Sequence, residues 1–166
     1  MWQRNLLIGF LILVCLTLQT TWIPQLGALL SQTDLIFALT VAFALLSGPT
    51  EGAIFGAIVG LLRGILLGPA LGIYAVPLYI LGYAVGHFSR IVNHDSILVP
   101  LAVGSLATIA YWLMLTALTG GFYGFWISGH FWLALPGMLI ANSFMTLFIY
   151  SLFRRFDKRL RDGGRR

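Results

Sequence analysis

The sequence predicts an all-α membrane protein with six transmembrane helices. The chain has 166 residues, of which 59% are hydrophobic and only 9% are charged, whereas a soluble domain carries about 25% charged residues. Apolar runs with short connections fill most of this length, and a transmembrane helix needs about 20 such residues. Because lipid cannot satisfy backbone polar groups, these runs are expected to be helices. We therefore predict one transmembrane domain over residues 1–153 and a basic tail over residues 154–166.

The limits of each helix follow from the apolar runs and from the glycines and prolines between them. The first run, Leu6–Ile23, lacks a small-residue cleavage site after it, so we interpret it as an uncleaved span rather than a signal peptide. Helices two to four are short or rich in glycine, so a count of five or seven spans stays open. The five later helices are predicted over Leu29–Leu46, Glu51–Leu67, Ile73–Phe88, Ile97–Leu118 and Phe131–Phe153.

The basic residues indicate the orientation of the chain. Seven of the ten Lys and Arg residues lie in the tail, while Arg4 precedes the first helix and Arg90 follows the fourth. The connections expected on the opposite side contain no Lys or Arg. Because basic residues are retained on the cytoplasmic side, we predict a multi-pass protein of the cytoplasmic (inner) membrane with both termini in the cytoplasm.

Glycines recur every four residues along the third helix and again in the fourth. Small residues at this spacing let two helices approach closely, which favours their packing in lipid. Each four-residue step drifts by about 40° around a helix, so we expect the third helix to contact several neighbours at the centre of the bundle. A substrate cavity lined by bare backbone and an interface with another protein are the alternatives. The predicted packing residues are Gly52, Gly56, Gly60, Gly64, Gly82 and Gly86.

Two opposite charges are predicted at the same depth in the membrane. Asp34 and Arg63 each lie 12 residues from the cytoplasmic end of their predicted helices, about 18 Å of helix. An ionisable side chain inside the membrane pairs with another or faces a polar cavity, so we predict an Asp34–Arg63 ion pair. In the alternative, Arg63 extends to the outer interface and Asp34 caps its helix. Asn142 and Ser143, in the sixth helix, are expected to form hydrogen bonds between helices.

Aromatic residues gather in the connection before the sixth helix. Tyr and Trp favour the membrane–water interface, where both their apolar rings and their polar atoms are accommodated. One interpretation is therefore an interfacial belt, and the other is a patch that contacts a partner's transmembrane or juxtamembrane segment. The candidate contact residues are Phe122, Tyr123, Phe125 and Trp126.

The basic tail is expected to continue the sixth helix into water. Basic residues near an anionic leaflet contribute roughly 1 kcal/mol each to membrane attraction. Contact with anionic lipid and topological anchoring are both consistent with this charge, whereas nucleic-acid binding would need a folded element that the tail lacks. The candidate lipid contacts are Arg154, Arg155, Lys158 and Arg159.

The residue pattern does not indicate an enzyme. His87 and His94 are expected on the cytoplasmic side and His130 on the opposite side, and no two histidines are four residues apart on a helix. A metal site would therefore lack ligands. We expect no catalytic residue, cofactor or metal.

A pattern of glycines and short motifs runs from Thr33 to Arg90. It consists of Thr33-Asp34-Leu35, the run Leu45–Gly52, Gly56, Gly60-Leu61-Leu62, the run Gly68–Gly72 and Gly82-Tyr83. Together with the chain length, the uncleaved first span and the basic tail, this pattern resembles MreD, the rod-shape-determining membrane protein family of bacteria. MreD proteins often carry an acidic residue near the end of the third helix, where this chain has Arg63-Gly64, so no role of that acid is carried over.

The resemblance implies a non-enzymatic scaffold of the cell-elongation machinery that helps to organise peptidoglycan synthesis. The implied partners are MreC, the MreB filament, and the RodA polymerase with its penicillin-binding transpeptidase. The resemblance also implies a six-helix fold similar to the substrate-binding subunits of energy-coupling-factor transporters. The alternative function is therefore a solute-binding subunit of a vitamin-type transporter, which should present convergent polar groups around a cavity. An intramembrane enzyme is a third class.

Overall fold

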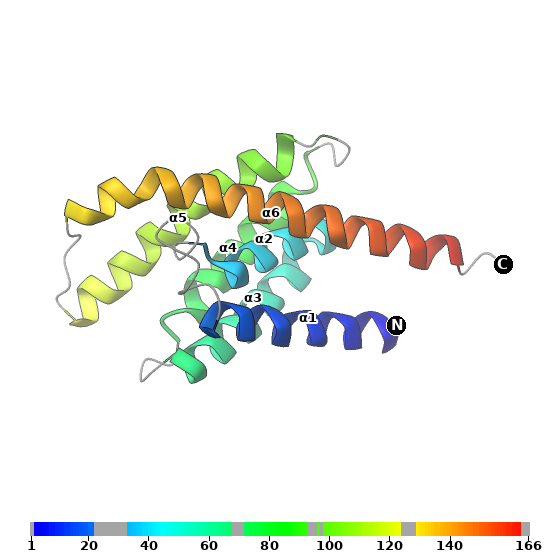
Figure 1. Cartoon of the computed structure of the whole chain (residues 1–166), viewed down its shortest axis with the longest axis horizontal. Helices are drawn as coiled ribbons and strands as arrows, with labels where there is room; N and C mark the ends of the chain where they lie inside the picture. The colour runs from blue at the N-terminus through cyan, green and yellow to red at the C-terminus, as the bar shows by residue number, and fades with distance from the viewer. Residues whose placement is uncertain are drawn as a thin grey trace.

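A bundle of helices accounts for all regular secondary structure in the part of the chain that is described. The computed structural model describes residues 2–21, 33–67, 72–92, 96, 98–123 and 129–163, with side chains described for residues 9, 12–21, 33–67, 72–92, 96, 98–120 and 135–155. The start of α1 and the end of α6 lie at the same end of the bundle (Figure 1). The helices are α1 (Trp2–Thr21), α2 (Leu35–Ser47), α3 (Pro49–Leu67), α4 (Ala75–Phe88), α5 (Leu98–Tyr123) and α6 (Gly129–Gly163).

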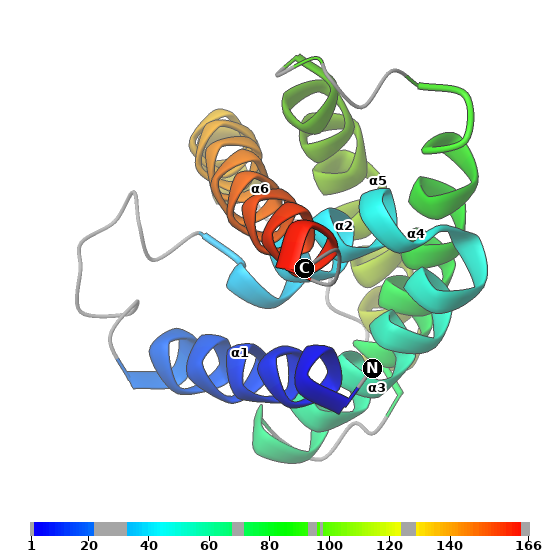
Figure 2. The same cartoon turned by 90° about the vertical axis from the view of Figure 1, so that its right-hand side faces the viewer.

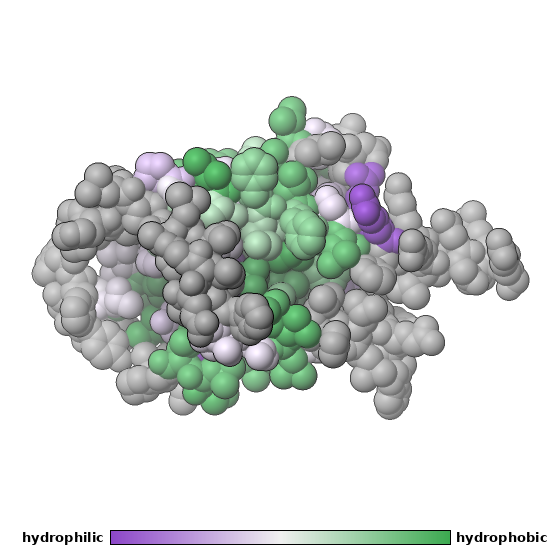
Figure 3. Space-filling model, viewed as in Figure 1, coloured by the Kyte–Doolittle hydropathy of each residue, from purple (hydrophilic) through white to green (hydrophobic). Residues whose placement is uncertain are grey.

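Three segments of the described helices are long and apolar enough to span a membrane. They are Pro49–Leu67 in α3, Leu98–Gly120 in α5 and Leu135–Arg155 in α6. α2 has 13 residues and α4 has 14, which gives each about 20 Å of helix against a hydrocarbon core of about 30 Å. Hydrophobic residues cover much of the coloured, described surface on one face of the molecule (Figure 3).

The short helix α2 occupies the centre of the bundle. It packs against each of the other five helices, and the end-on view shows it between α6 and the α3–α4 pair (Figure 2). α3 contacts more than one neighbour, as predicted, since it packs against α4 and α2. It is not central, however, because it exposes one apolar side, including Ile54, Ile58 and Ile65. All the glycines of α3 lie on the opposite, buried side of the helix. The buried residues of α2 are Leu35, Ile36, Phe37, Ala38, Leu39, Thr40, Val41, Ala42, Ala44 and Leu45.

Two helix limits differ from the predicted ones for local reasons. α2 begins at Leu35 rather than at Leu29, because the Asp34 side chain accepts a hydrogen bond from the Phe37 backbone N–H and caps the helix. Between α2 and α3, Gly48 has a φ of 92°, a conformation that glycine adopts without steric cost. α3 then begins at Pro49, a favoured residue in the first helical position.

The glycines of α3 and α4 form a close seam between these two helices. A Cβ added to Gly52 would lie 2.7 Å from the Gly82 carbonyl oxygen, and one added to Gly60 would lie 2.5 Å from the Ala75 Cα. A Cβ on Gly56 would overlap the Leu78 carbonyl. Gly86 closes the seam against Gly48 and Pro49, and Gly64 is buried. The repeat therefore allows backbone-to-backbone packing, as the spacing predicted.

The α5–α6 pair is joined by a polar contact. The hydroxyls of Ser105 and Ser143 lie 2.7 Å apart, which confirms the hydrogen bond between helices predicted for Ser143. Both helices extend beyond the predicted limits, since α5 continues past Leu118 to Tyr123 and α6 continues through the basic residues to Gly163. The tail is thus helical with α6 as far as it is described.

Candidate functional site

Polar side chains from different helices meet around the first turn of α2. We call this group the polar centre. Its acid, Asp34, is 4% exposed and Asn142 is fully buried. Its members come from α1, the start of α2, α3, the turn before α4, α5 and α6, and they are Gln19, Thr33, Asp34, Arg63, Tyr74, Tyr111 and Asn142.

Asp34 uses its two carboxylate oxygens for different partners. Oδ1 accepts a hydrogen bond of 3.0 Å from the Phe37 N–H, and Oδ2 forms an ion pair with Nη1 of Arg63. A carboxylate is stabilised at the positive end of a helix dipole as well as by a nearby cation. The sequence presented the ion pair and the helix cap as alternatives, but the structure contains both.

Arg63 is held on three sides within the bundle. Besides the ion pair, Nη1 lies 3.3 Å from the hydroxyl oxygen of Tyr111. The guanidinium carbon lies 4.6 Å from the centre of the Tyr74 ring, a distance at which an aromatic face attracts a cation. The Arg63 side chain is only 12% exposed. The alternative in which Arg63 extends to the outer interface is therefore wrong.

Backbone groups at the start of α2 are satisfied from two other helices. The Asp34 N–H donates to Oδ1 of Asn142 at 2.9 Å, so α6 holds the residue that carries the acid. The Leu35 N–H donates to Oε1 of Gln19 at 2.6 Å, and the Gln19 amide nitrogen donates to the Thr33 carbonyl at 3.3 Å. The first N–H groups of a helix have no partner within it. Side chains of α1 and α6 supply these partners.

Three buried polar atoms of the polar centre have no hydrogen-bond partner among the described residues. They are Oγ1 of Thr33, Nε of Arg63 and Nδ2 of Asn142. A buried polar group without a partner costs free energy, so such atoms usually have a bound water or ligand as partner. The polar centre therefore combines a neutralised charge pair with a hydroxyl, an amide N–H and a guanidinium N–H that remain able to bond.

Only part of the polar centre follows from the sequence. The depth of Asp34 and Arg63 along their helices indicated the pair. The hydrogen bond that Asn142 accepts from the Asp34 N–H confirms the role between helices that was predicted for Asn142. Gln19 and Tyr111 were missed. Each lies among other polar residues of its apolar run, so the sequence did not single it out, and its depth relative to Asp34 depends on how the helices are staggered in the bundle.

The other candidate residues lie at the ends of α5 and α6. Phe122 and Tyr123 form part of the last turn of α5 rather than of a loop, while their side chains, and all of Phe125 and Trp126, lie outside the described residues. Arg154 and Arg155 line a pocket beside α5. Lys158 and Arg159 continue α6, with side chains outside the described set.

Among the described residues, no cluster of side chains forms a metal centre. No group of three His, Cys, Asp or Glu side chains is close enough together there to hold a metal ion. The arrangement at α2 is chemically a buried ion pair with hydrogen-bonding capacity around it. Comparisons of the chain with protein-family models, with curated proteins and with solved structures found no match.

Proposed function

We propose that the chain is a non-enzymatic membrane scaffold of the bacterial cell-elongation machinery, a protein of the MreD type that binds MreC and helps to organise peptidoglycan synthesis. The proposal includes six crossings of the cytoplasmic membrane, two of them by the short helices α2 and α4. Both termini then face the cytoplasm. The motif pattern from Thr33 to Gly82-Tyr83 and the common end shared by the start of α1 and the end of α6 support this arrangement.

The observation that carries the scaffold proposal is how the buried charges are used. Asp34 and Arg63 neutralise one another, and the polar centre joins elements from across the bundle. A buried pair of this kind fixes one arrangement of helices rather than leaving a charge for a substrate. The outward surface, in contrast, is apolar along much of α3, α4 and α6. Such a molecule is suited to presenting a fixed lipid-facing surface to other membrane proteins.

An apolar groove between α4 and α5 is the surface that we assign to the transmembrane helix of MreC. The groove has a volume of about 220 Å³, and its alanines permit close approach of another helix, which drives association in lipid. The glycine seam is already occupied by internal packing, so it is not available to a partner. The groove is lined by Leu81, Ala84, Val85, Phe88, Val103, Leu106, Ala107, Ala110 and Met114.

The scaffold proposal is tested by purifying the tagged chain from its native membrane in mild detergent and identifying the proteins that accompany it. We expect MreC, with RodA, its transpeptidase and MreB in smaller amounts. In a second arm, Ala84→Trp fills the groove from an exposed position of α4 and should reduce MreC recovery about tenfold, whereas Leu113→Trp, at an exposed position of α5, should leave it unchanged. Wild-type purification without MreC would contradict the scaffold, and equal recovery with both variants would contradict the groove.

A solute-binding subunit of a vitamin-type transporter is the second candidate, and one observation favours it. Buried polar atoms of Thr33, Arg63 and Asn142 in the polar centre have no partner among the described residues, and a small-molecule site needs a few such polar groups to orient its ligand. The same purification separates the two candidates. Recovery of an ATPase pair with a coupling membrane subunit, together with a small molecule released on denaturation, would support the transporter and overturn the scaffold.

A further inference from the structure

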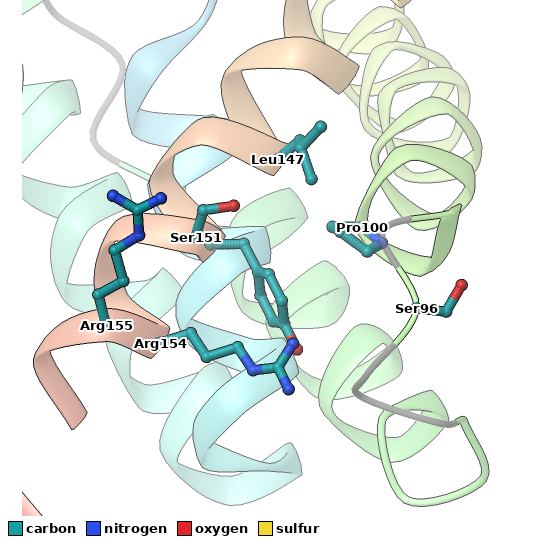
Figure 4. A pocket seen from close by; sticks show the side chains of 7 residues that line it. Ser96, Pro100, Leu147, Ser151, Arg154 and Arg155 are labelled. Carbon is teal, nitrogen blue, oxygen red and sulfur yellow. The ribbon is translucent and has the colours of Figure 1, made fainter. Parts of the chain in front are cut away.

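A pocket opens between α5 and α6 at the end of the bundle where α6 becomes basic. Its volume is about 240 Å³. Leu147 and Ser151 of α6 point toward Pro100 in the first turn of α5, and the Arg154 side chain extends into the same space (Figure 4). The pocket is lined by Ser96, Pro100, Leu147, Tyr150, Ser151, Arg154 and Arg155.

The electrostatic character of this pocket is positive. Among the described residues that line it are two arginines and no acidic side chain. α5 begins at Leu98, so the positive end of a 26-residue helix lies at the same place. The Ser96 hydroxyl accepts a 3.3 Å hydrogen bond from the Leu98 N–H, which fixes this serine at the start of α5. The pocket therefore favours an anion.

The lining also combines hydrogen-bonding groups with an apolar wall. Ser96, Ser151 and the buried Tyr150 supply hydroxyl groups, and the guanidinium of an arginine matches the oxygens of a phosphate. Leu147 and Pro100 form the apolar side. On the next residue of α6, Phe148 is 66% exposed, so apolar surface continues outward from the pocket. A ligand with a phosphate group and an attached apolar chain satisfies both parts.

We propose that this pocket is a specific binding site for the phosphate of an anionic phospholipid, with an acyl chain lying along the outer surface of α6. The phosphate chemistry is shared by a soluble phosphate, but only a lipid also uses the apolar wall and the adjoining surface. The site differs from general attraction of the basic tail to the membrane, because it depends on the space between α5 and α6. It is independent of the scaffold proposal, since it requires no partner protein.

The test uses the isolated full-length chain in detergent, with bound lipids counted by native mass spectrometry. The probes are palmitoyl-oleoyl phosphatidylglycerol, phosphatidylcholine with the same chains, and excess inorganic phosphate. We expect one phosphatidylglycerol to bind about tenfold more tightly than phosphatidylcholine, because phosphatidylcholine carries the same phosphate but adds a trimethylammonium cation that the arginines repel. Excess inorganic phosphate should not displace it.

Two kinds of variant separate the pocket from diffuse charge. The double variant Arg154→Gln, Arg155→Gln should weaken the first phosphatidylglycerol about tenfold, whereas Arg90→Gln removes an exposed arginine outside the pocket and should have no effect. Leu147→Trp fills the pocket while keeping both arginines and should abolish the selective site. Leu113→Trp is its control on the exposed surface of α5.

Each alternative result overturns the proposal in a distinct way. Equal weakening by Arg90→Gln would show attraction by net charge alone, and retained selectivity in Leu147→Trp would place the lipid elsewhere. Displacement by inorganic phosphate would identify a soluble anion as the ligand. Thermal unfolding of every variant shows whether it is folded. Arg154→Lys keeps the positive charge but loses the planar guanidinium that can form two parallel hydrogen bonds, so it should bind phosphatidylglycerol with intermediate affinity.

Discussion

At the scale of single residues, the polar centre is organised around the Asp34 carboxylate. One of its oxygens caps α2 and the other pairs with Arg63, so the carboxylate completes a local structure and a long-range contact at once. The desolvation of two buried charges offsets much of their attraction, which makes the pair a weak net source of stability. Removing only one of the two residues should destabilise the protein, because the remaining charge stays buried without a counter-charge. The pair therefore acts mainly by selecting one arrangement of α2 and α3.

A double-mutant cycle tests this account of the pair. Asp34→Asn keeps a good capping residue but leaves Arg63 unpaired, and Arg63→Met leaves the acid unpaired. We expect each single substitution to cost about 3 kcal/mol. The double variant should be more stable than either single one, because no isolated charge remains. Thermal unfolding in detergent micelles measures this, and costs that simply add would show that the two residues act independently.

The Asn142 amide is expected to contribute more to stability than the Thr146 hydroxyl, which is equally buried on α6. Asn142→Leu leaves the Asp34 N–H without its acceptor, which should cost about 1–3 kcal/mol of stability. Thr146→Val is the matched control, since the fully buried Thr146 hydroxyl has no hydrogen-bond partner in the described bundle. Loss of the Thr146 hydroxyl should leave the stability of the protein unchanged or raise it. Similar destabilisation by both substitutions in the same unfolding measurement would show that the Asn142 effect is one of volume rather than of hydrogen bonding.

At the scale of helices, the α3–α4 seam shows how packing in lipid depends on residue size. Hydrophobicity does not distinguish the inside from the outside of such a bundle, because both neighbouring helices and lipid tails are apolar. The glycines allow the backbones to approach until Gly52 and Gly82 face one another directly. Close van der Waals contact along the seam then supplies the preference for a helix partner over lipid.

The seam gives a sharp comparison between two Gly→Ala substitutions. Gly56→Ala places a methyl group against the Leu78 carbonyl, so α3 and α4 must separate and stability should fall by about 1–3 kcal/mol. Gly9→Ala, in α1, meets no atom of the described residues within 4 Å and should leave the unfolding temperature unchanged or slightly raised. Unchanged stability in Gly56→Ala would mean that the seam does not hold these helices together.

The predictability of the elements differs for a physical reason. The four-residue glycine spacing predicted the seam, because close approach requires small residues wherever it occurs. The central place of α2 was not predictable from its apolar pattern, since a helix facing lipid and a helix buried in the bundle present the same kind of side chain. Likewise, the depth of Asp34 and Arg63 followed from counting residues along two adjacent helices, whereas the contribution of Tyr111 required the position of α5.

At the scale of the whole molecule, the polar centre and the pocket between α5 and α6 lie at different parts of the bundle and involve different chemistry. The polar centre joins helices from inside, whereas the arginine-lined pocket lies where α6 becomes basic. The apolar groove between α4 and α5 belongs to a third surface. In the proposed scaffold, internal rigidity, lipid contact and partner contact are therefore assigned to separate sets of residues.

The proposed six-span topology is tested by cysteine labelling. In a Cys15→Ala background, Ser128→Cys lies in the connection predicted to be outside, and Arg155→Cys lies on the basic part of α6. A membrane-impermeant maleimide should label position 128 in cells whose outer envelope alone is opened. Position 155 should react only after the inner membrane is permeabilised. Labelling of both positions from one side would show that α6 does not cross the membrane, which the proposed topology requires.

The short connection at Gly48 has a consequence for biogenesis. Asp34 leaves the ribosome 29 residues before Arg63, so its carboxylate reaches the insertion machinery before its counter-charge does. A 13-residue helix that begins with an unpaired acid is a poor candidate for release into lipid by itself. We therefore expect α2 to be retained until α3 has been synthesised and the two to enter the bilayer as one hairpin. The ion pair would then set the order of insertion as well as the final structure.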